Sequence, residues 1–228
     1  KTTWRVKLAA SQIMASGGSG DRDVFLLDAG LDVAATVKSK FGVSVEFGRI
    51  VPRHEGFGTQ NYQQVEAGME WAASTVLAAT LRGGIEWREF DEVPSRDTKL
   101  SPVVSAAIHW QPSETTRINA GLHLANELSN VQAGALYQAL RTGLEVTQDL
   151  WSQFYFTGEV SHVHRHYEDG RSVDEPSVRA VLGYRTEEDN ATNRLRVELF
   201  CQWGERRTKG EPAIADRTQV GLQITRYF

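Results

Sequence analysis

The sequence predicts an all-β fold: a single antiparallel up-and-down β-barrel of about 12 strands, with residues 1–228 as one domain. Three observations predict this fold. Apolar and polar residues alternate with a period of two along the whole chain, which is the pattern of a strand with two different faces. The alternating segments have similar lengths, about 11 to 15 residues. Polar or glycine-containing stretches separate them at regular intervals, and no linker divides the chain.

The first half of the chain contains six of the predicted strands. In the first of them, Trp4 and Val6 face one side while Arg5 and Lys7 face the other. The next five segments alternate in the same way. These six strands are predicted at 4–14, 24–38, 41–51, 61–72, 76–90 and 100–111.

The second half contains the other six strands, and the eleventh illustrates their pattern. Leu195, Val197 and Leu199 alternate there with Arg196 and Glu198. The six strands are predicted at 116–128, 136–147, 151–167, 177–187, 193–206 and 219–228.

The lengths of the strands and of their connections indicate a membrane. Strands of soluble proteins average about 5–6 residues, whereas a tilted strand that crosses a bilayer needs about 9–11. Short connections near 39–40, 73–75, 112–115, 148–149 and 188–191 alternate with longer ones at 15–23, 52–60, 91–99, 129–135, 168–176 and 207–216. This alternation with an even number of strands is typical of bacterial outer-membrane barrels, and it places the N- and C-termini on the periplasmic side.

Alternation alone does not decide which face of the sheet meets lipid. The apolar face consists mainly of Ala, Val and Leu, whereas a sealed core usually contains bulkier interlocking side chains. The polar face carries a glycine on most strands, which relieves crowding inside a curved barrel. Aromatic residues near the strand ends predict two interfacial girdles, with Trp4, Trp71, Trp87, Trp110 and Trp203 as members. We therefore expect the apolar face to contact lipid.

Composition and histidine spacing argue against other kinds of site. The formal net charge of −4 leaves no basic surface for nucleic acid, and one cysteine excludes an internal disulfide. Same-face residues of a strand lie about 6.6 Å apart, so His162, His164 and His166 of the HVHRH stretch cannot easily bind one metal ion. We expect a polar rim there, and we predict no metal and no cofactor.

The last ten residues, QVGLQITRYF, end an alternating strand on an aromatic residue. They resemble the C-terminal assembly signal of bacterial outer-membrane β-barrel proteins, although Arg226 stands where that signal usually has an apolar residue. The resemblance implies that the barrel-assembly machinery recognises this strand and that the protein lies in the outer membrane, against lipid and lipopolysaccharide. The matching residues are Gln219, Val220, Gly221, Leu222, Ile224 and Phe228.

Charged residues of the polar face predict the wall of a lumen. Twelve strands lie between the roughly eight that fill their interior and the 16–18 that enclose a channel, so we expect a narrow, wet bore. The predicted function is a porin-like channel for passive diffusion of small polar or charged solutes, without enzymatic activity. The predicted lumen-lining residues are Asp28, Asp32, Glu46, Glu66, Glu70, Arg82, Arg141, Arg179, Arg185, Arg194 and Arg196.

Several alternatives stay open. The same charged residues could pair laterally and close the bore, which would leave a structural barrel. An autotransporter's translocator barrel also has twelve strands and a terminal Phe. An outer-membrane lipid-active enzyme would need a clustered nucleophile and base, and the sequence has no GxSxG. A soluble ligand-binding barrel or sandwich would purify without detergent. The chain also resembles small twelve-stranded porins for acidic oligosaccharides in length and terminal Phe, but their lumens are arginine-lined and this one is mixed.

Overall fold

The computed structural model describes residues 1–13, 22–52, 59–91, 99–128, 136–151, 153–186, 194–209 and 215–227. None of these segments forms a helix with the length and apolar character to cross a membrane. They form twelve strands: β1 (Thr2–Ile13), β2 (Arg22–Ala34), β3 (Ser39–Pro52), β4 (Gln60–Ala72), β5 (Leu77–Phe90), β6 (Lys99–Trp110), β7 (Thr116–Leu128), β8 (Leu136–Asp149), β9 (Phe154–Tyr167), β10 (Ser172–Arg185), β11 (Arg194–Thr208) and β12 (Ala215–Tyr227).

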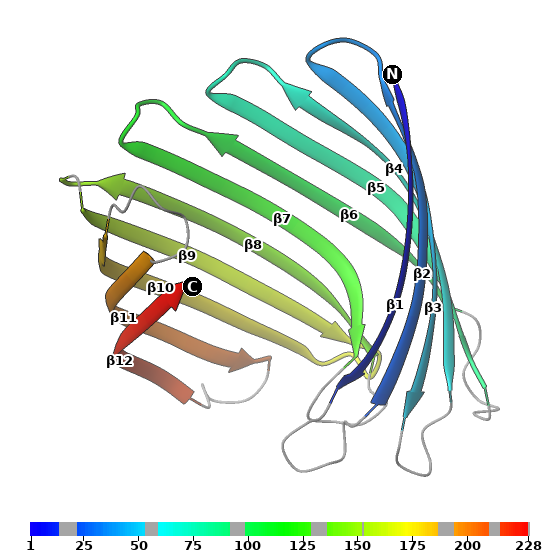
Figure 1. The fold of residues 1–228 in the computed structure, drawn as a ribbon. Helices are drawn as coiled ribbons and strands as arrows, with labels where there is room; N and C mark the ends of the chain where they lie inside the picture. The colour runs from blue at the N-terminus through cyan, green and yellow to red at the C-terminus, as the bar shows by residue number, and fades with distance from the viewer. Residues whose placement is uncertain are drawn as a thin grey trace.

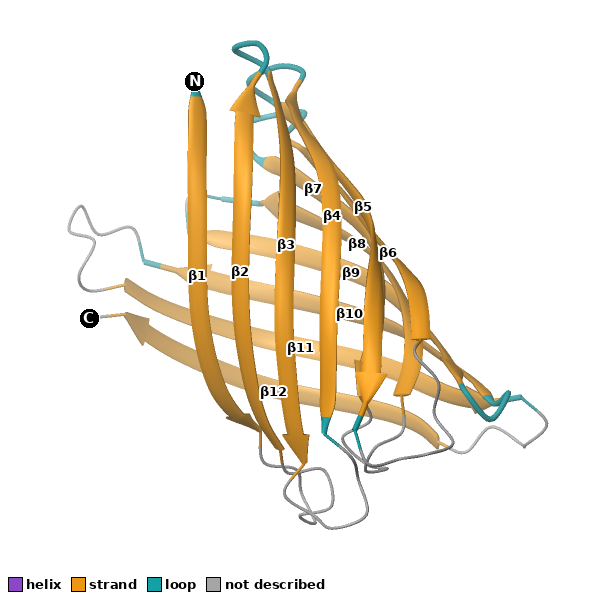
Figure 2. Cartoon of the chain, turned by 90° about the vertical axis from the view of Figure 1, so that its right-hand side faces the viewer, coloured by secondary structure: helices purple, strands orange, loops and turns teal. Residues whose placement is uncertain are grey.

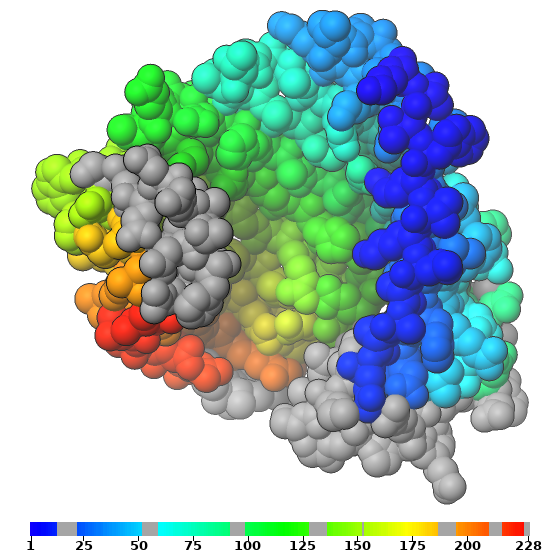
Figure 3. Space-filling model, viewed as in Figure 1, coloured from blue at the N-terminus to red at the C-terminus, as the bar shows by residue number. Residues whose placement is uncertain are grey.

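The twelve strands form one antiparallel sheet in which every strand pairs with its neighbours in sequence, from β1 to β12 (Figure 1). This confirms the predicted all-β, up-and-down architecture. The sheet curls around a hollow that is open on the side between β1 and the C-terminal strands (Figure 3). Within the described residues, no ladder joins β12 to β1, so these two strands are the edges of the sheet (Figure 2).

The strand bounds differ most from the prediction at β10. This strand begins at Ser172 rather than at 177, so the predicted loop 168–176 is reduced to 168–171. The loop was predicted from the polar run, and Pro176 within it has no N–H to donate to a ladder. In the structure Pro176 faces His162 of β9, and the register between β10 and β11 skips Glu175 and Pro176. The strand therefore accommodates the proline at a gap in its pairing with β11.

Several other strand ends shift by a few residues. β2 ends at Ala34 rather than at 38, and β12 begins at Ala215 rather than at 219. β8 extends to Asp149, which the sequence placed in a turn. The extension matters for function because it brings Asp149 onto the polar face of the sheet, opposite Tyr155 of β9.

Both ends of the chain lie at the same end of the sheet. Thr2 of β1 pairs with Val33, next to the short connection 35–38, and Tyr227 of β12 pairs with Arg194 at the start of β11. Which side of a membrane this end faces remains a prediction. The Gly/Ser-rich stretch 15–21 and Phe228 lie outside the described residues.

The polar face of the sheet is the concave one. Concave side chains are crowded by neighbouring strands, so they should be less exposed than those on the convex face. The adjacent residues Glu198 and Leu199 show the difference, because the glutamate is 7% exposed and the leucine 52%. Glu86 and Arg88 are likewise buried, whereas Trp87 between them is exposed. The convex surface is therefore apolar, as expected of a face that meets lipid.

Candidate functional site

The concave face collects the predicted lumen residues. Cross-strand partners share a face, and the registers place every predicted lumen residue with a described side chain on this face, in the same rows as Glu86 and Glu198. Arg194 belongs to β11, but its side chain lies outside the described part of the structure.

The acidic residues of β2 to β4 bind partners close to them. The hydroxyl of Tyr62 donates to Glu46 at 2.9 Å. Glu70 lies between Arg82, at 3.3 Å, and Lys40, at 3.6 Å. These partners come from adjacent strands, so the pairs run along the wall and do not bridge the hollow.

A buried polar group lies where β4, β5 and β7 approach one another. Arg88 Nε donates to Glu86 at 2.9 Å, and both side chains are 4% exposed. Arg88 also donates to Gln60, and Asn126 of β7 donates to Glu86 of β5 at 2.9 Å. The contact between β5 and β7 shows that the sheet curls tightly here.

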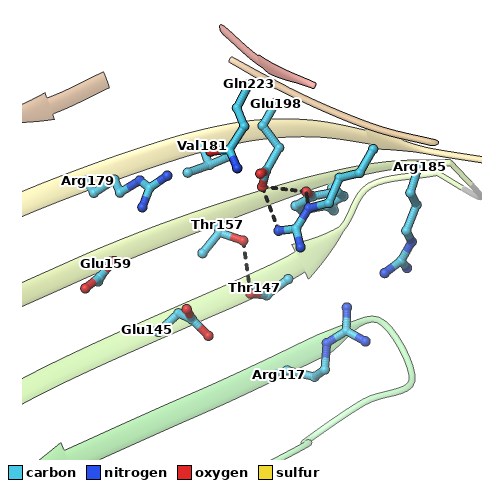
Figure 4. A pocket seen from close by; sticks show the side chains of 12 residues that line it. Arg117, Glu145, Thr147, Thr157, Glu159, Arg179, Val181, Arg185, Glu198 and Gln223 are labelled. Carbon is cyan, nitrogen blue, oxygen red and sulfur yellow. Dashed lines mark hydrogen bonds and ion pairs between the residues drawn. The ribbon is translucent and has the colours of Figure 1, made fainter. Parts of the chain in front are cut away.

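A cavity of about 500 Å³ lies against the concave face of β7 to β12 (Figure 4). Its lining mixes guanidinium, carboxylate and hydroxyl groups with little apolar surface. The charged lining residues are Arg117, Glu145, Glu159, Arg179, Arg185, Arg196 and Glu198. The cavity therefore suits a small polar solute better than an apolar one.

Tyr155 organises one side of this cavity. Its hydroxyl donates to Glu198 at 2.7 Å and accepts from Arg196 Nε at 2.7 Å, while Arg196 Nη2 donates to Glu198 at 2.6 Å. To reach β11 from β9, the ring lies across β10 at Gly183, where a Cβ would stand 2.1 Å from the ring. Glycine at this position is therefore required for the network.

Asp149 organises the other side. Its carboxylate accepts from Arg117 at 3.0 Å and lies 3.0 Å from Arg185. One carboxylate thus holds two guanidinium groups, from β7 and β10, at the end of the cavity nearest the short connections. The group keeps a net positive charge, since two cations share one anion.

The convex face carries the predicted girdle and the histidines. Trp4, Trp71, Trp87, Trp110 and Trp203 are all exposed there, at both ends of the strands; their role as a girdle remains a prediction. His162 and His164 both lie within hydrogen-bonding distance of Asp174, at 3.1 and 2.8 Å. The described residues include no cluster of three side chains able to hold a metal ion.

The residues of the predicted assembly signal alternate between the two faces. Ile224 is exposed on the convex face, while Gln219 and Gly221 lie in the row of the concave face. Phe228 lies outside the described residues. Recognition of this strand by an assembly machinery remains a prediction.

Sequence reasoning missed the organising roles of Asp149 and Tyr155. Asp149 continues the two-residue spacing of Glu145 and Thr147, and this spacing was the available signal that β8 extends further. Alternation within the predicted strand 151–167 puts Tyr155 on the polar face, but no pattern in the sequence indicates that its ring crosses β10. Gly183 was the available signal, because a glycine in a strand often marks a close approach by another group.

Comparison with known proteins gives a likeness of fold. No protein-family model matches the sequence, and no curated protein sequence matches it either. The structure is similar to the outer membrane channel DcaP of Acinetobacter baumannii, with a TM-score of 0.62 and 13% sequence identity, over 98% of this chain and 71% of that one. The likeness shows that the chain has the fold of outer-membrane β-barrel proteins.

The beta domain of the Bordetella autotransporter Brka is also similar, with a TM-score of 0.36 and 12% identity, over 99% of this chain and 98% of that one. This superposition is too loose to support a functional argument.

Proposed function

We propose that the protein lies in a bacterial outer membrane and that its concave face lines a path for passive diffusion of small polar or charged solutes. The exposed apolar residues of the convex face would contact lipid, with polar groups such as His162 and His164 near the lipopolysaccharide headgroups. No metal, cofactor or catalytic group takes part in this proposal.

The observation that carries the proposal is the direction of the ion pairs. Charged groups would close a bore if they met across it. Most of the described pairs run along the wall instead, as in Arg82–Glu70 and Arg141–Glu127 between adjacent strands, or Arg196–Glu198 within one strand. The described pair between distant strands, Lys99 of β6 with Glu168, lies at the end of the sheet away from the cavity. Lateral pairs neutralise the wall and leave the space in front of it free, and a cavity of about 500 Å³ lies there. This argues against the closed structural barrel.

The residue pattern of the C-terminal strand supports insertion into the membrane by the barrel-assembly machinery. Its alternation of concave-facing Gln219 and Gly221 with exposed Leu222 and Ile224 fits the assembly signal that the sequence resembles. We propose that the barrel-assembly machinery recognises β12, including Phe228.

Single-channel conductance in a planar bilayer tests the proposed function. The detergent-purified protein should give steady open steps, and a salt gradient should report its ion selectivity. Glu46→Lys should shift selectivity toward anions and Arg185→Glu toward cations, because both side chains lie on the concave face. Absence of conductance from protein whose folding is verified by heat-modifiable gel mobility would overturn the proposal.

A further inference from the structure

The wall formed by β8 to β11 carries two like-charged cross-strand pairs of opposite sign. Glu145 of β8 stands directly opposite Glu159 of β9. Arg185 of β10 stands directly opposite Arg196 of β11. Like charges placed opposite each other destabilise a sheet, so stability of the fold does not account for either pair. All four side chains line the same cavity.

The arginine pair is held in place by its neighbours. Asp149 fixes Arg185 together with Arg117, and Tyr155 with Glu198 fixes Arg196. Two guanidinium groups around Asp149 leave a net positive charge that an anionic group could use. The cavity thus has a preorganised anion-binding end, whose donors already occupy fixed positions.

The glutamate pair is much less compensated. Glu145 accepts one hydrogen bond, from Asn119 at 2.9 Å. Glu159 has no hydrogen bond or ion pair with any described side chain, although Arg179 is its cross-strand neighbour. Arg179 instead lies over the ring of Phe200, at 5.1 Å, and its buried Nε has no hydrogen-bond partner among the described residues. The two carboxylates therefore form an end of the cavity that favours a cation.

The two ends lie on one wall with hydroxyl groups between them. Figure 4 shows the carboxylates of Glu145 and Glu159 on one side and the guanidinium groups of Arg117 and Arg185 on the other, with the bonded pair Thr147–Thr157 between. Asp149 lies four positions after Glu145 on β8, which corresponds to about 13 Å along the strand. An extended chain covers about 3.3–3.6 Å per residue, so a tripeptide of about 10–11 Å spans this distance together with a hydrogen bond of about 2.9 Å at one end.

We propose that this cavity binds small solutes with an ammonium group at one end and a carboxylate at the other, with short peptides as the chemical class. The carboxylate would bind Arg117 and Arg185, and the ammonium group would bind Glu145 and Glu159. A solute with anionic groups at both ends would meet the two glutamates. This inference rests on the proposed function, because it names the solutes that the path would hold.

Calorimetric titration of the detergent-purified protein tests the site without requiring conduction. The three ligands are triglycine, N-acetyltriglycine, which lacks the ammonium group, and triglycine amide, which lacks the carboxylate. We expect triglycine to bind at least tenfold more tightly than either capped form. Equal affinities for the three ligands, or no binding of triglycine at millimolar concentration, would overturn the inference.

Substitutions assign each end of the ligand to its partners. Glu159→Gln should abolish the preference for triglycine over N-acetyltriglycine while keeping the preference over the amide, and Arg185→Gln should do the reverse. Glu145→Gln serves as a second test of the acidic end if folding of the Glu159 variant is impaired. The controls Glu168→Gln and Arg171→Gln lie at the opposite ends of the strands and should keep both tenfold preferences. An unchanged preference in both glutamate variants would contradict the assignment.

Different results would overturn the proposed channel and the proposed peptide-binding site. A protein that binds triglycine selectively but conducts no ions would contradict the channel and retain the site. A protein that conducts but does not distinguish triglycine from its capped forms would contradict the site and retain the channel.

Discussion

The β1–β2 edge and the β4–β7 region carry the same kind of ion pair in opposite surroundings. Arg5 and Asp28 lie 3.2 Å apart at the edge, with side chains 42% and 18% exposed, whereas the side chains of Arg88 and Glu86 are only 4% exposed. Every described side chain of β1 is exposed. The alternating pattern is the same in both regions, so the difference comes from the neighbours: Gln60 of β4 and Asn126 of β7 bind the pair on β5, whereas β1 is an edge with a neighbouring strand on one side only.

This comparison indicates which polar side chains of the concave face are held in fixed positions by their neighbours. Polar side chains next to the unpaired edge are exposed to water, whereas Glu86, Asp149 and Glu198 are each held by partners from other strands. Backbone groups at a sheet edge need partners inside a bilayer, so the edges β1 and β12 are also the part of the sheet that depends most on its surroundings.

Removing one member of the buried pair should have the largest effect. Arg88→Met leaves the Glu86 carboxylate buried without its cation, and such a loss costs about 3–5 kcal/mol. Arg5→Met removes the matching residue of the exposed pair and should cost less than about 1 kcal/mol. Urea unfolding in detergent, followed by tryptophan fluorescence, measures both free energies. Equal losses would contradict the difference in burial between the two regions.

A methyl group at Gly183 should have an intermediate effect. Gly183→Ala places a Cβ about where the ring of Tyr155 lies, so the ring must move and its bonds to Glu198 and Arg196 break. Overpacking and the lost hydrogen bonds predict a loss of about 2–3 kcal/mol in the free energy of unfolding. Gly143→Ala is the matched control, because its Cβ would lie 3.9 Å from the nearest atom. A loss at Gly143 as large as that at Gly183 would contradict this explanation.

The exposed connection between β9 and β10 should show the smallest effect, in the titration of Asp169. The backbone N–H of Arg171 donates to its carboxylate and the guanidinium of Arg171 binds it, so the pKa of Asp169 lies below its ordinary value. A lowered pKa in the folded state adds stability above the unfolded-state pKa, and this contribution disappears as the pH falls through the folded-state pKa. NMR titration of the carboxyl group should show the low midpoint, and Arg171→Gln should raise it. A midpoint unchanged by that substitution would exclude Arg171 as the cause.

The fold could be predicted from the sequence because alternation over long segments has one simple physical meaning. Strand ends were harder to predict, as β10 shows, because the gap in the ladder that accommodates Pro176 depends on the neighbouring strand. The contacts of the site were not predictable, since a residue's partners depend on register. Glu145 and Glu159 belong to the polar face by alternation, but only the register places them opposite each other.

Cysteine labelling in the membrane tests most directly whether the concave face meets water and the convex face lipid. Cys201 is exposed on the convex face of β11, and the next residue, Gln202, lies on the concave face. In proteoliposomes, a charged, membrane-impermeant maleimide should label Gln202→Cys in a Cys201→Ser background. It should leave native Cys201 unlabelled until the bilayer is dissolved and the protein unfolded. Labelling of Cys201 in the intact bilayer, together with protection of the cysteine at position 202, would contradict the account.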